Sequence, residues 1–143
     1  FKTLFGGGEA QLLLMEEGDM LEAGIDIIAR PPGKRQQSIS LLSGGERGLT
    51  ATALLFALFE TKPSPFCVLD EIDAPLDDAN ISRFSSMLTQ YASKTQFIVI
   101  THSKLTMEKA DVIYGATMEE AGVSRIISAK FREDKVVKEA QPA

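Results

Sequence analysis

The sequence has 143 residues, of which 44% are hydrophobic and 24% charged, and its formal net charge is −5. This length is typical of one domain, and such a chain can bury about 68–70% of the surface that its unfolded form exposes. No apolar run approaches the roughly 20 residues of a membrane span, so we expect no membrane partner. The acidic balance excludes a uniformly basic nucleic-acid surface and leaves room only for local DNA contact.

The chain begins at Phe1, with neither an initiator methionine nor the pattern of a signal peptide, which indicates a fragment of something longer. Cys67 is the only cysteine, and it stands in an apolar run. A single cysteine in such a run predicts a buried thiol in a reducing compartment.

Two short apolar segments, residues 11–15 and 24–29, are separated by glycine and acidic residues. They predict antiparallel strands at the edge of the domain. The glycines at 6–8 look like a phosphate loop, but no Lys-Ser or Lys-Thr follows them and no helical pattern begins behind them. A hairpin turn is therefore favoured there.

The segment 30–35 also contains the pair Gly-Lys, at Gly33 and Lys34. A P-loop needs a glycine four positions before that pair and a hydroxyl directly after it, whereas Ala29 and Arg35 stand there. The segment predicts a rigid basic loop, which either lies near a phosphate or a partner or is simply solvated.

From residue 43 onward the sequence alternates between helical patterns and apolar runs. A helix through residues 49–59 has apolar side chains on several faces and should be buried on several sides. The runs 66–69 and 97–100 predict parallel strands covered on both faces, with a helical pattern at 81–91 between them. This order predicts an α/β fold with a right-handed crossover, in which edge antiparallel strands accompany the parallel ones.

Further strands are expected at residues 112–113 and 123–129, while the residues after 132 are charged and poor in apolar anchors. We assign residues 1–132 to one lobe and residues 133–143 to a charged tail, which is either frayed or the root of a longer element.

Polar residues stand directly after the two apolar runs. Asp70 and Glu71 follow the first run, and Thr101 and His102 follow the second. Ligands of open parallel sheets bind outside the carboxyl ends of the strands. Two adjacent carboxylates at such an end must be solvated, paired or bound to a metal, which makes this edge the first candidate site.

A second candidate precedes the first long helix. Ser43 and Glu46 have the spacing of a capping box, which by itself indicates only a helix start. The box encloses Gly44 and Gly45, which weaken a helix but clear side chains from its N-terminus. A cleared N-terminus offers free N–H groups and the positive end of the helix dipole to an anion.

These features together resemble the ABC ATPases. Residues 42–46 resemble the signature motif, residues 66–71 the Walker B motif, residues 74–77 the D-loop, and His102 the switch histidine, in the order of that family. The sequences of several segments resemble the C-terminal half of the ABC-type ATPase head of a bacterial SMC (structural maintenance of chromosomes) protein. These segments are residues 31–34, 41–47, 65–73, 96–102 and 106–124. Two departures are Gly48 and Pro75, at positions where the family often has alanine.

The resemblance implies roles for individual residues. Asp70 would hold Mg²⁺, Glu71 would be the catalytic base or position the attacking water, and His102 would contact the γ-phosphate of ATP. The nucleotide bound to the opposite head would contact the signature segment through Ser43, Gly44, Gly45 and Glu46. Asp77 of the D-loop would link the two sites. Leu42 is expected to set the entry of the helix rather than to touch nucleotide.

The resemblance also implies partners. The P-loop would lie in an N-terminal half of the same head, so this chain alone should not hydrolyse ATP. A second SMC head, a kleisin subunit with its accessory protein, and DNA reached through the full complex would complete the assembly, which would be cytoplasmic, nucleoid-associated and engaged in chromosome condensation and segregation. A long coiled coil would join the two halves of the head.

Alternative functions follow from the same residues. Asp73 and Asp78 lie in the acidic turn and would suit a magnesium-dependent nuclease, although that leaves the glycine-rich helix start without a role. The chain could also be a non-catalytic kleisin-docking lobe that uses exposed apolar residues within 110–131, or part of the head of a related DNA-repair ABC ATPase.

Overall fold

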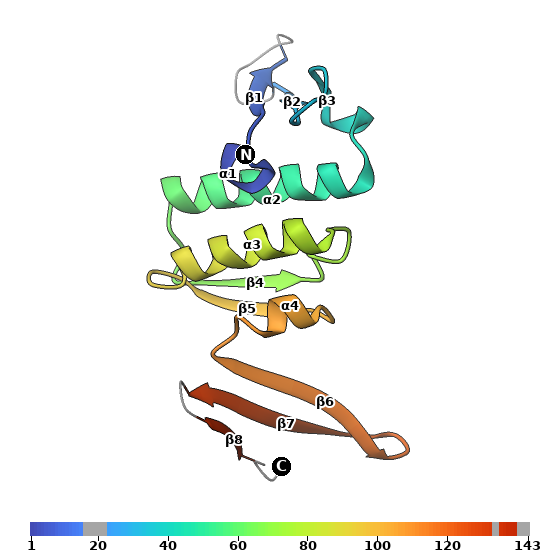
Figure 1. The fold of residues 1–143 in the computed structure, drawn as a ribbon, viewed down its shortest axis with the longest axis vertical. Helices are drawn as coiled ribbons and strands as arrows, with labels where there is room; N and C mark the ends of the chain where they lie inside the picture. Colours follow the sequence, from blue (N-terminus) through green and yellow to red (C-terminus); the bar gives the residue numbers. More distant parts are fainter. Residues whose placement is uncertain (16–22, 133–134, 140–143) are drawn as a thin grey trace.

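The computed structural model describes residues 1–15, 23–132 and 135–139. In this part of the chain the strands form three separate sheets, and Figure 1 shows them stacked along the long axis with α1, α2 and α3 between the first and the second. The elements in chain order are α1 (Lys2–Phe5), β1 (Glu9–Leu14), β2 (Ile25–Arg30), β3 (Gln37–Ser38), the 3-10 turn η1 (Ile39–Leu41), α2 (Gly44–Thr61), β4 (Phe66–Asp70), α3 (Asp78–Tyr91), β5 (Gln96–Ile100), α4 (Lys104–Met107), β6 (Val112–Glu120), β7 (Val123–Arg132) and β8 (Lys135–Glu139). None of the described helices is both long enough and apolar enough to cross a membrane.

The first sheet confirms the predicted antiparallel strands near the N-terminus. β1 pairs with β2 so that Leu14 lies opposite Ile25, and the short β3 joins the other edge of β2. The glycines at 6–8 are not a hairpin turn, which corrects the sequence prediction. Gly6 is the left-handed C-cap of α1, with φ 68°, and the three glycines lead from that helix into β1.

The central layer confirms the predicted α/β unit. β4 and β5 are parallel and in register from Phe66 opposite Gln96 to Asp70 opposite Ile100, and α3 lies between them in the chain. The helices α2 and α3 pack on one face of this pair. Phe56 of α2 is 2% exposed, and its ring centroid lies 6.2 Å from that of Phe84 and 6.5 Å from that of Phe97.

The second face of the β4–β5 pair is uncovered, which corrects the prediction that both faces are buried. Along each strand exposed side chains alternate with half-buried or buried ones. The exposed face carries Phe66 (58% exposed), Val68 (55%), Ile98 (49%) and Ile100 (51%). The described residues therefore supply one covering layer for a pair of strands whose sequence is apolar on both faces.

The helix α2 is also less covered than its sequence predicts. Its buried side chains, among them Leu49, Ala53 and Phe56, face α3 and the sheet. Leu58 is 59% exposed, so α2 is not buried on several sides in this chain. Cys67, expected to be buried, is half-buried on the covered face of β4, and burial raises the pKa of its thiol.

The third sheet comprises β6, β7 and β8, all antiparallel. β8 lies within the segment that the sequence separates as a charged tail, so residues 135–139 extend the sheet instead of fraying. The assignment of residues 133–143 to a unit of their own stays a prediction, and residues 133–134 and 140–143 lie outside the described part.

Candidate nucleotide site

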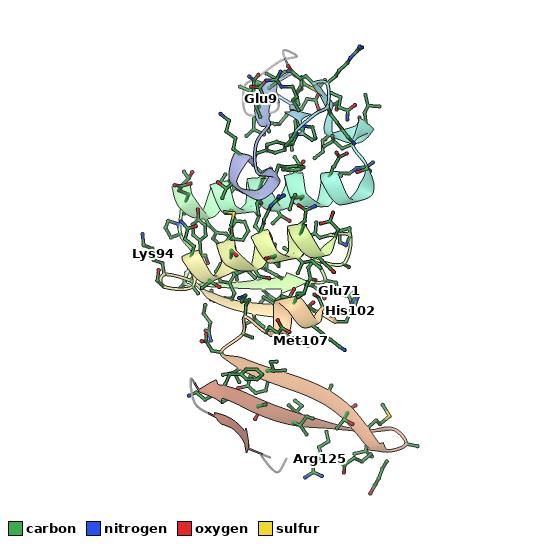
Figure 2. The ribbon with its side chains drawn as sticks, viewed as in Figure 1. Glu9, Glu71, Lys94, His102, Met107 and Arg125 are labelled. Atoms are coloured by element: carbon green, nitrogen blue, oxygen red, sulfur yellow. The ribbon has the colours of Figure 1, made fainter. Side chains whose placement is uncertain are left out.

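The two strand ends meet at one edge of the central sheet. Asp70 is the last residue of β4, and Glu71 and His102 follow the ends of β4 and β5. The Nδ1 atom of His102 lies 3.8 Å from Oε1 of Glu71. Figure 2 shows both side chains at the arrowhead end of the strands, with Lys94 at the opposite end. The predicted catalytic pair is thus brought together, and its two side chains are 61% and 74% exposed, open to a ligand.

Glu71 has an unusual backbone conformation. Its φ is 48°, the only positive φ at a non-glycine position in the described part of the chain. The conformation is held by its own N–H, which donates to the Ile100 carbonyl at 2.9 Å, and by its carbonyl, which accepts from the Ala74 N–H at 3.1 Å. A non-glycine residue in this region costs about 1–3 kcal/mol, and such strain clusters at functional sites. The strained turn therefore carries the Glu71 side chain at the end of β4, 3.8 Å from His102.

The predicted capping box is formed at the start of α2. Ser43 Oγ accepts from the Glu46 N–H, and Glu46 Oε2 accepts from the Ser43 N–H at 3.2 Å and from Ser43 Oγ at 2.9 Å. The second Glu46 oxygen accepts from the Lys34 ammonium at 2.8 Å. That hydrogen bond lowers the pKa of Glu46, and the bonds from Ser43 lower it further.

The basic loop at 30–35 lies beside the segment 42–46, because Lys34 pairs with Glu46 while its side chain stays 51% exposed. Both interpretations of this loop, a contact with a phosphate or partner and a solvated loop, stay predictions. Leu42 is 3% exposed and packs at the helix entry, in agreement with the structural role expected of it.

The two glycines of the signature segment differ in their surroundings. A Cβ at Gly44 would meet no atom within 4 Å, so this position is open to an incoming ligand. A Cβ at Gly45 would lie 2.9 Å from the Pro75 carbonyl oxygen. Gly45 therefore lets the D-loop backbone approach the helix, a contact within this lobe that sequence reasoning missed.

Gly48 and Pro75, the two departures from the family pattern, contact each other. A Cβ at Gly48 would lie 2.9 Å from Cγ of Pro75, so the proline ring fills the space of an alanine methyl. We expect Gly48→Ala to destabilise this chain by up to about 2 kcal/mol, because overpacking of about 1–3 kcal/mol outweighs the helix-propensity gain of about 0.5–1 kcal/mol. With Pro75→Ala present, the same change should stabilise it by about 1 kcal/mol.

Urea unfolding of the four combinations measures this sign change. Gly44→Ala is the matched control, because that site is open and its effect should not depend on residue 75. Equal effects of Gly48→Ala in both backgrounds would contradict the contact.

Asp77 caps α3. Its carboxylate accepts from the Asn80 N–H at 2.8 Å, so the residue has a role in helix formation whatever it does toward a second site. Asp70 is exposed at the end of β4. No three His, Cys, Asp or Glu side chains converge on a metal position in residues 1–15 and 23–131. A single free carboxylate fits Mg²⁺ only where phosphates and water supply the other ligands.

The acidic turn does not form a carboxylate cluster. Asp73 is 2% exposed, and its Oδ2 accepts hydrogen bonds from the hydroxyls of Thr101 and Thr106. A buried carboxylate committed to two threonines is not available as a metal ligand, and Asp78 lies in the first turn of α3. The nuclease alternative therefore gains no support from this geometry.

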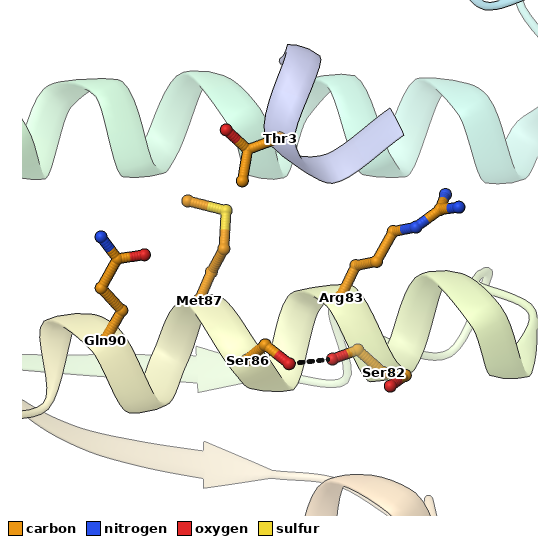
Figure 3. Close-up of a pocket in the computed structure, with 6 residues that line it drawn as sticks. All are labelled: Thr3, Ser82, Arg83, Ser86, Met87 and Gln90. Atoms are coloured by element: carbon orange, nitrogen blue, oxygen red, sulfur yellow. Dashed lines mark hydrogen bonds between the residues drawn. The ribbon is translucent and has the colours of Figure 1, made fainter. Parts of the chain in front are cut away.

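A shallow pocket lies elsewhere, between α1 and α3 (Figure 3). Its lining includes Arg83, whose guanidinium donates to the Leu4 carbonyl at 3.4 Å, and Ser86, whose hydroxyl donates to the Ser82 carbonyl at 2.8 Å. None of the predicted site residues lines it, so this pocket is separate from the candidate nucleotide site.

Comparisons with known proteins place the chain in a family. A family model described as the RecF/RecN/SMC N terminal domain matches residues 22–125. The chromosome partition protein Smc of Bacillus subtilis (strain 168) is 59% identical over 135 residues, which are 94% of this chain and 11% of that protein. The chain thus spans about a tenth of the length of such relatives.

Solved structures agree with the fold. One is the Smc head domain from Pyrococcus furiosus, with an extended coiled coil and bound to the C-terminal domain of ScpA. It is 43% identical to this chain and has a TM-score of 0.81, and the match covers 90% of this chain and 32% of the chain in that structure. A second structure comes from work on ATP-driven dimerization and DNA-stimulated activation of SMC ATPases. It is 42% identical to this chain and has a TM-score of 0.80, and the match covers 89% of this chain and 76% of the chain in that structure.

The description of the matching family names an N-terminal domain, which runs against the prediction that the chain is the C-terminal half of the head. The C-terminal placement is therefore not confirmed. The coarser assignment holds, because the family match covers most of the chain and the solved heads share its fold. The chain belongs to the RecF/RecN/SMC N-terminal domain family, as part of an SMC ATPase head.

Proposed function

We propose that this chain is the lobe of an SMC ATPase head that carries the signature motif, Walker B, the D-loop and the switch histidine, and that it hydrolyses ATP only when joined to a P-loop half. The observation that carries the proposal is the pairing of Glu71 with His102, 3.8 Å apart at the carboxyl edge of parallel strands. Ligands of such sheets bind at this edge.

The proposed division of labour combines the family resemblance with the positions of these residues. Glu71 positions or deprotonates the attacking water, and His102 contacts the γ-phosphate from the neighbouring strand end. Asp70 would be one protein ligand of Mg²⁺, which when bound neutralises charge on the phosphates. Ser43 and the open backbone at Gly44 face a different ligand, the ATP held by a second head, since a helix N-terminus with a cleared approach suits an anion.

The uncovered sheet face supports the need for another half. Phe66, Val68, Ile98 and Ile100 form an apolar surface on adjacent strands, of the kind that a monomeric domain buries.

The position of this lobe in the longer chain is part of the proposal. The family description names the N-terminal domain, whereas the resemblance of the motifs between residues 43 and 102 supports the C-terminal half. Sequencing the reading frame upstream of Phe1 decides between them. A P-loop upstream supports the C-terminal placement, and a P-loop found only downstream overturns it.

A specific observation also supports a docking role. Tyr114 (72% exposed) and Ile126 (66%) lie on one face of the β6–β7 pair, where Ala116 of β6 is opposite Ile126 of β7, and Met118 (60%) follows within a register irregularity of β6. The relative from Pyrococcus furiosus is bound to the C-terminal domain of ScpA. We place a kleisin subunit on this face as a second function of the lobe, compatible with the first, within a chromosome-partitioning complex that reaches DNA.

The test is to mix this chain with the P-loop half of the same protein and measure ATP hydrolysis. The chain alone should show none, and the mixture should gain activity that Ser43→Arg abolishes, because a bulky cation at the helix start blocks the opposing nucleotide. If the two halves associate but hydrolyse no ATP, the lobe is better regarded as a docking module and the catalytic roles fall. ATP hydrolysis by the chain alone would contradict the need for a second half.

A further inference from the structure

Glu71 and His102 cannot be positioned by their own packing. Their side chains are 61% and 74% exposed, and Nδ1 of His102 lies 3.8 Å from Oε1 of Glu71. An exposed side chain keeps its place only if the backbone beneath it is fixed. The fixed points of the two strand-end turns therefore decide whether the pair stays aligned.

One buried carboxylate joins the two turns. Asp73 follows Glu71 by two positions and is 2% exposed. Its Oδ2 accepts from Thr101 Oγ1 at 2.6 Å and from Thr106 Oγ1 at 2.5 Å. Thr101 directly precedes His102, and its hydroxyl oxygen also accepts the Ser103 N–H at 2.9 Å, so the turn that carries His102 is tied on both sides.

The same turn reaches the signature helix. The Leu76 N–H donates to the Asp73 carbonyl at 3.0 Å, which closes the D-loop turn, and the Pro75 carbonyl within that turn lies against Gly45. Asp73 thus stands between the strand-end pair and the segment that meets the second nucleotide.

We propose that Asp73, through Thr101 and Thr106, is the positioning group that holds the His102 turn against the Glu71 turn in the catalytic geometry. This inference rests on the proposed function of the lobe and adds a part that touches neither ATP nor metal. Replacing an anchor at this depth by an isosteric apolar residue shifts the turn without removing a reacting group. The turnover rate should fall while ATP affinity holds.

The experiment compares Thr106→Val, Thr106→Ser and Thr95→Val in the complete head, formed from this chain and its P-loop half. Thr106→Val keeps the shape and removes the donor to Asp73, whereas Thr106→Ser keeps the hydroxyl. Thr95 is the matched control, since it is 3% exposed, donates to the Ser64 carbonyl at 2.7 Å, and precedes β5 at the opposite end of the sheet.

We expect Thr106→Val to lower kcat by about 10- to 100-fold with KM for ATP within about twofold of wild type, as displacement of a reacting group by about 1 Å costs on this order. Thr106→Ser should restore most of the rate. Thr95→Val should lower thermal stability comparably and leave kcat near wild type. Equal kcat in the two valine variants, or no rescue by serine, overturns the proposal.

Hydrogen exchange separates this inference from the proposed function. If the wild-type head shows no ATP hydrolysis, the catalytic assignment fails on its own, and the Asp73 inference is then judged by the amide of Ser103. That amide should exchange at least about 10-fold faster in Thr106→Val than in Thr95→Val, because it bonds to the tied Thr101 hydroxyl. Equal exchange in both variants overturns the inference even in an active head.

Discussion

Glu71→Gln is expected to lower ATP hydrolysis by the assembled head by about 10²–10⁴-fold, the usual contribution of a general base, and to leave ATP-dependent head dimers intact. Glutamine has the shape of glutamate and adopts the same backbone conformation, so the variant removes the negative charge and proton acceptance with little change in shape. Glu60→Gln is the control, because Glu60 is exposed near the end of α2. Steady-state hydrolysis and size-exclusion chromatography with ATP measure the two outcomes.

A structural effect at this position can be recognised separately. Glu71→Gly should also abolish hydrolysis, yet it should stabilise the fold by about 1 kcal/mol, because glycine adopts a φ of 48° without strain. Wild-type hydrolysis by Glu71→Gln would remove Glu71 from the mechanism. Loss of the dimers together with hydrolysis would assign Glu71 to nucleotide binding instead.

The parts of this lobe that could be predicted from sequence depend on neighbours along the chain. The capping box is complete within four residues, from Ser43 to Glu46, and both reciprocal bonds are present. The strand ends at Asp70 and Ile100 are marked by abrupt changes from apolar to polar residues. Once parallel pairing follows from the strand, helix, strand order, Glu71 and His102 must share an edge of the sheet.

The parts that could not be predicted depend on residues far apart in the chain. Asp73 meets Thr106 across 33 positions, and no local signal distinguishes a buried acid from a solvated one in a turn with other acids. Its place two residues after Glu71 was visible, but its threonine partners were not. The contact of Gly45 with the Pro75 carbonyl is of the same kind, since it requires the D-loop and the signature helix to be placed in space.

Two other differences have separate causes, one a missing local signal and the other a missing neighbour. The glycines at 6–8 were assigned to a hairpin because the four-residue helix before them is too short to show a periodic pattern. The apolar runs at 66–69 and 97–100 correctly indicate strands with two apolar faces, but a sequence does not state which polypeptide segment covers the second face. In this chain α2 and α3 cover only one.

The uncovered face gives the second large effect. Val68→Asp should weaken association with the P-loop half by more than about 100-fold in Kd, because an unpaired charge buried in an apolar interface costs several kcal/mol and each 1.4 kcal/mol is tenfold. Val68 lies directly opposite Ile98 in the middle of the face. Because Val68 is 55% exposed in this chain, the change should cost the chain itself no more than about 1 kcal/mol.

Leu58→Asp is the matched control for this prediction. It introduces the same charge at a similarly exposed apolar side chain, 59% exposed, but on the uncovered side of α2. Isothermal titration calorimetry gives Kd for both variants, and thermal unfolding of each checks the chain. If Leu58→Asp weakens association and Val68→Asp does not, the P-loop half covers α2 and the β4–β5 face awaits a different partner. Weaker association with Val68→Asp alone identifies the exposed β4–β5 face as the interface between the two halves of the ATPase head.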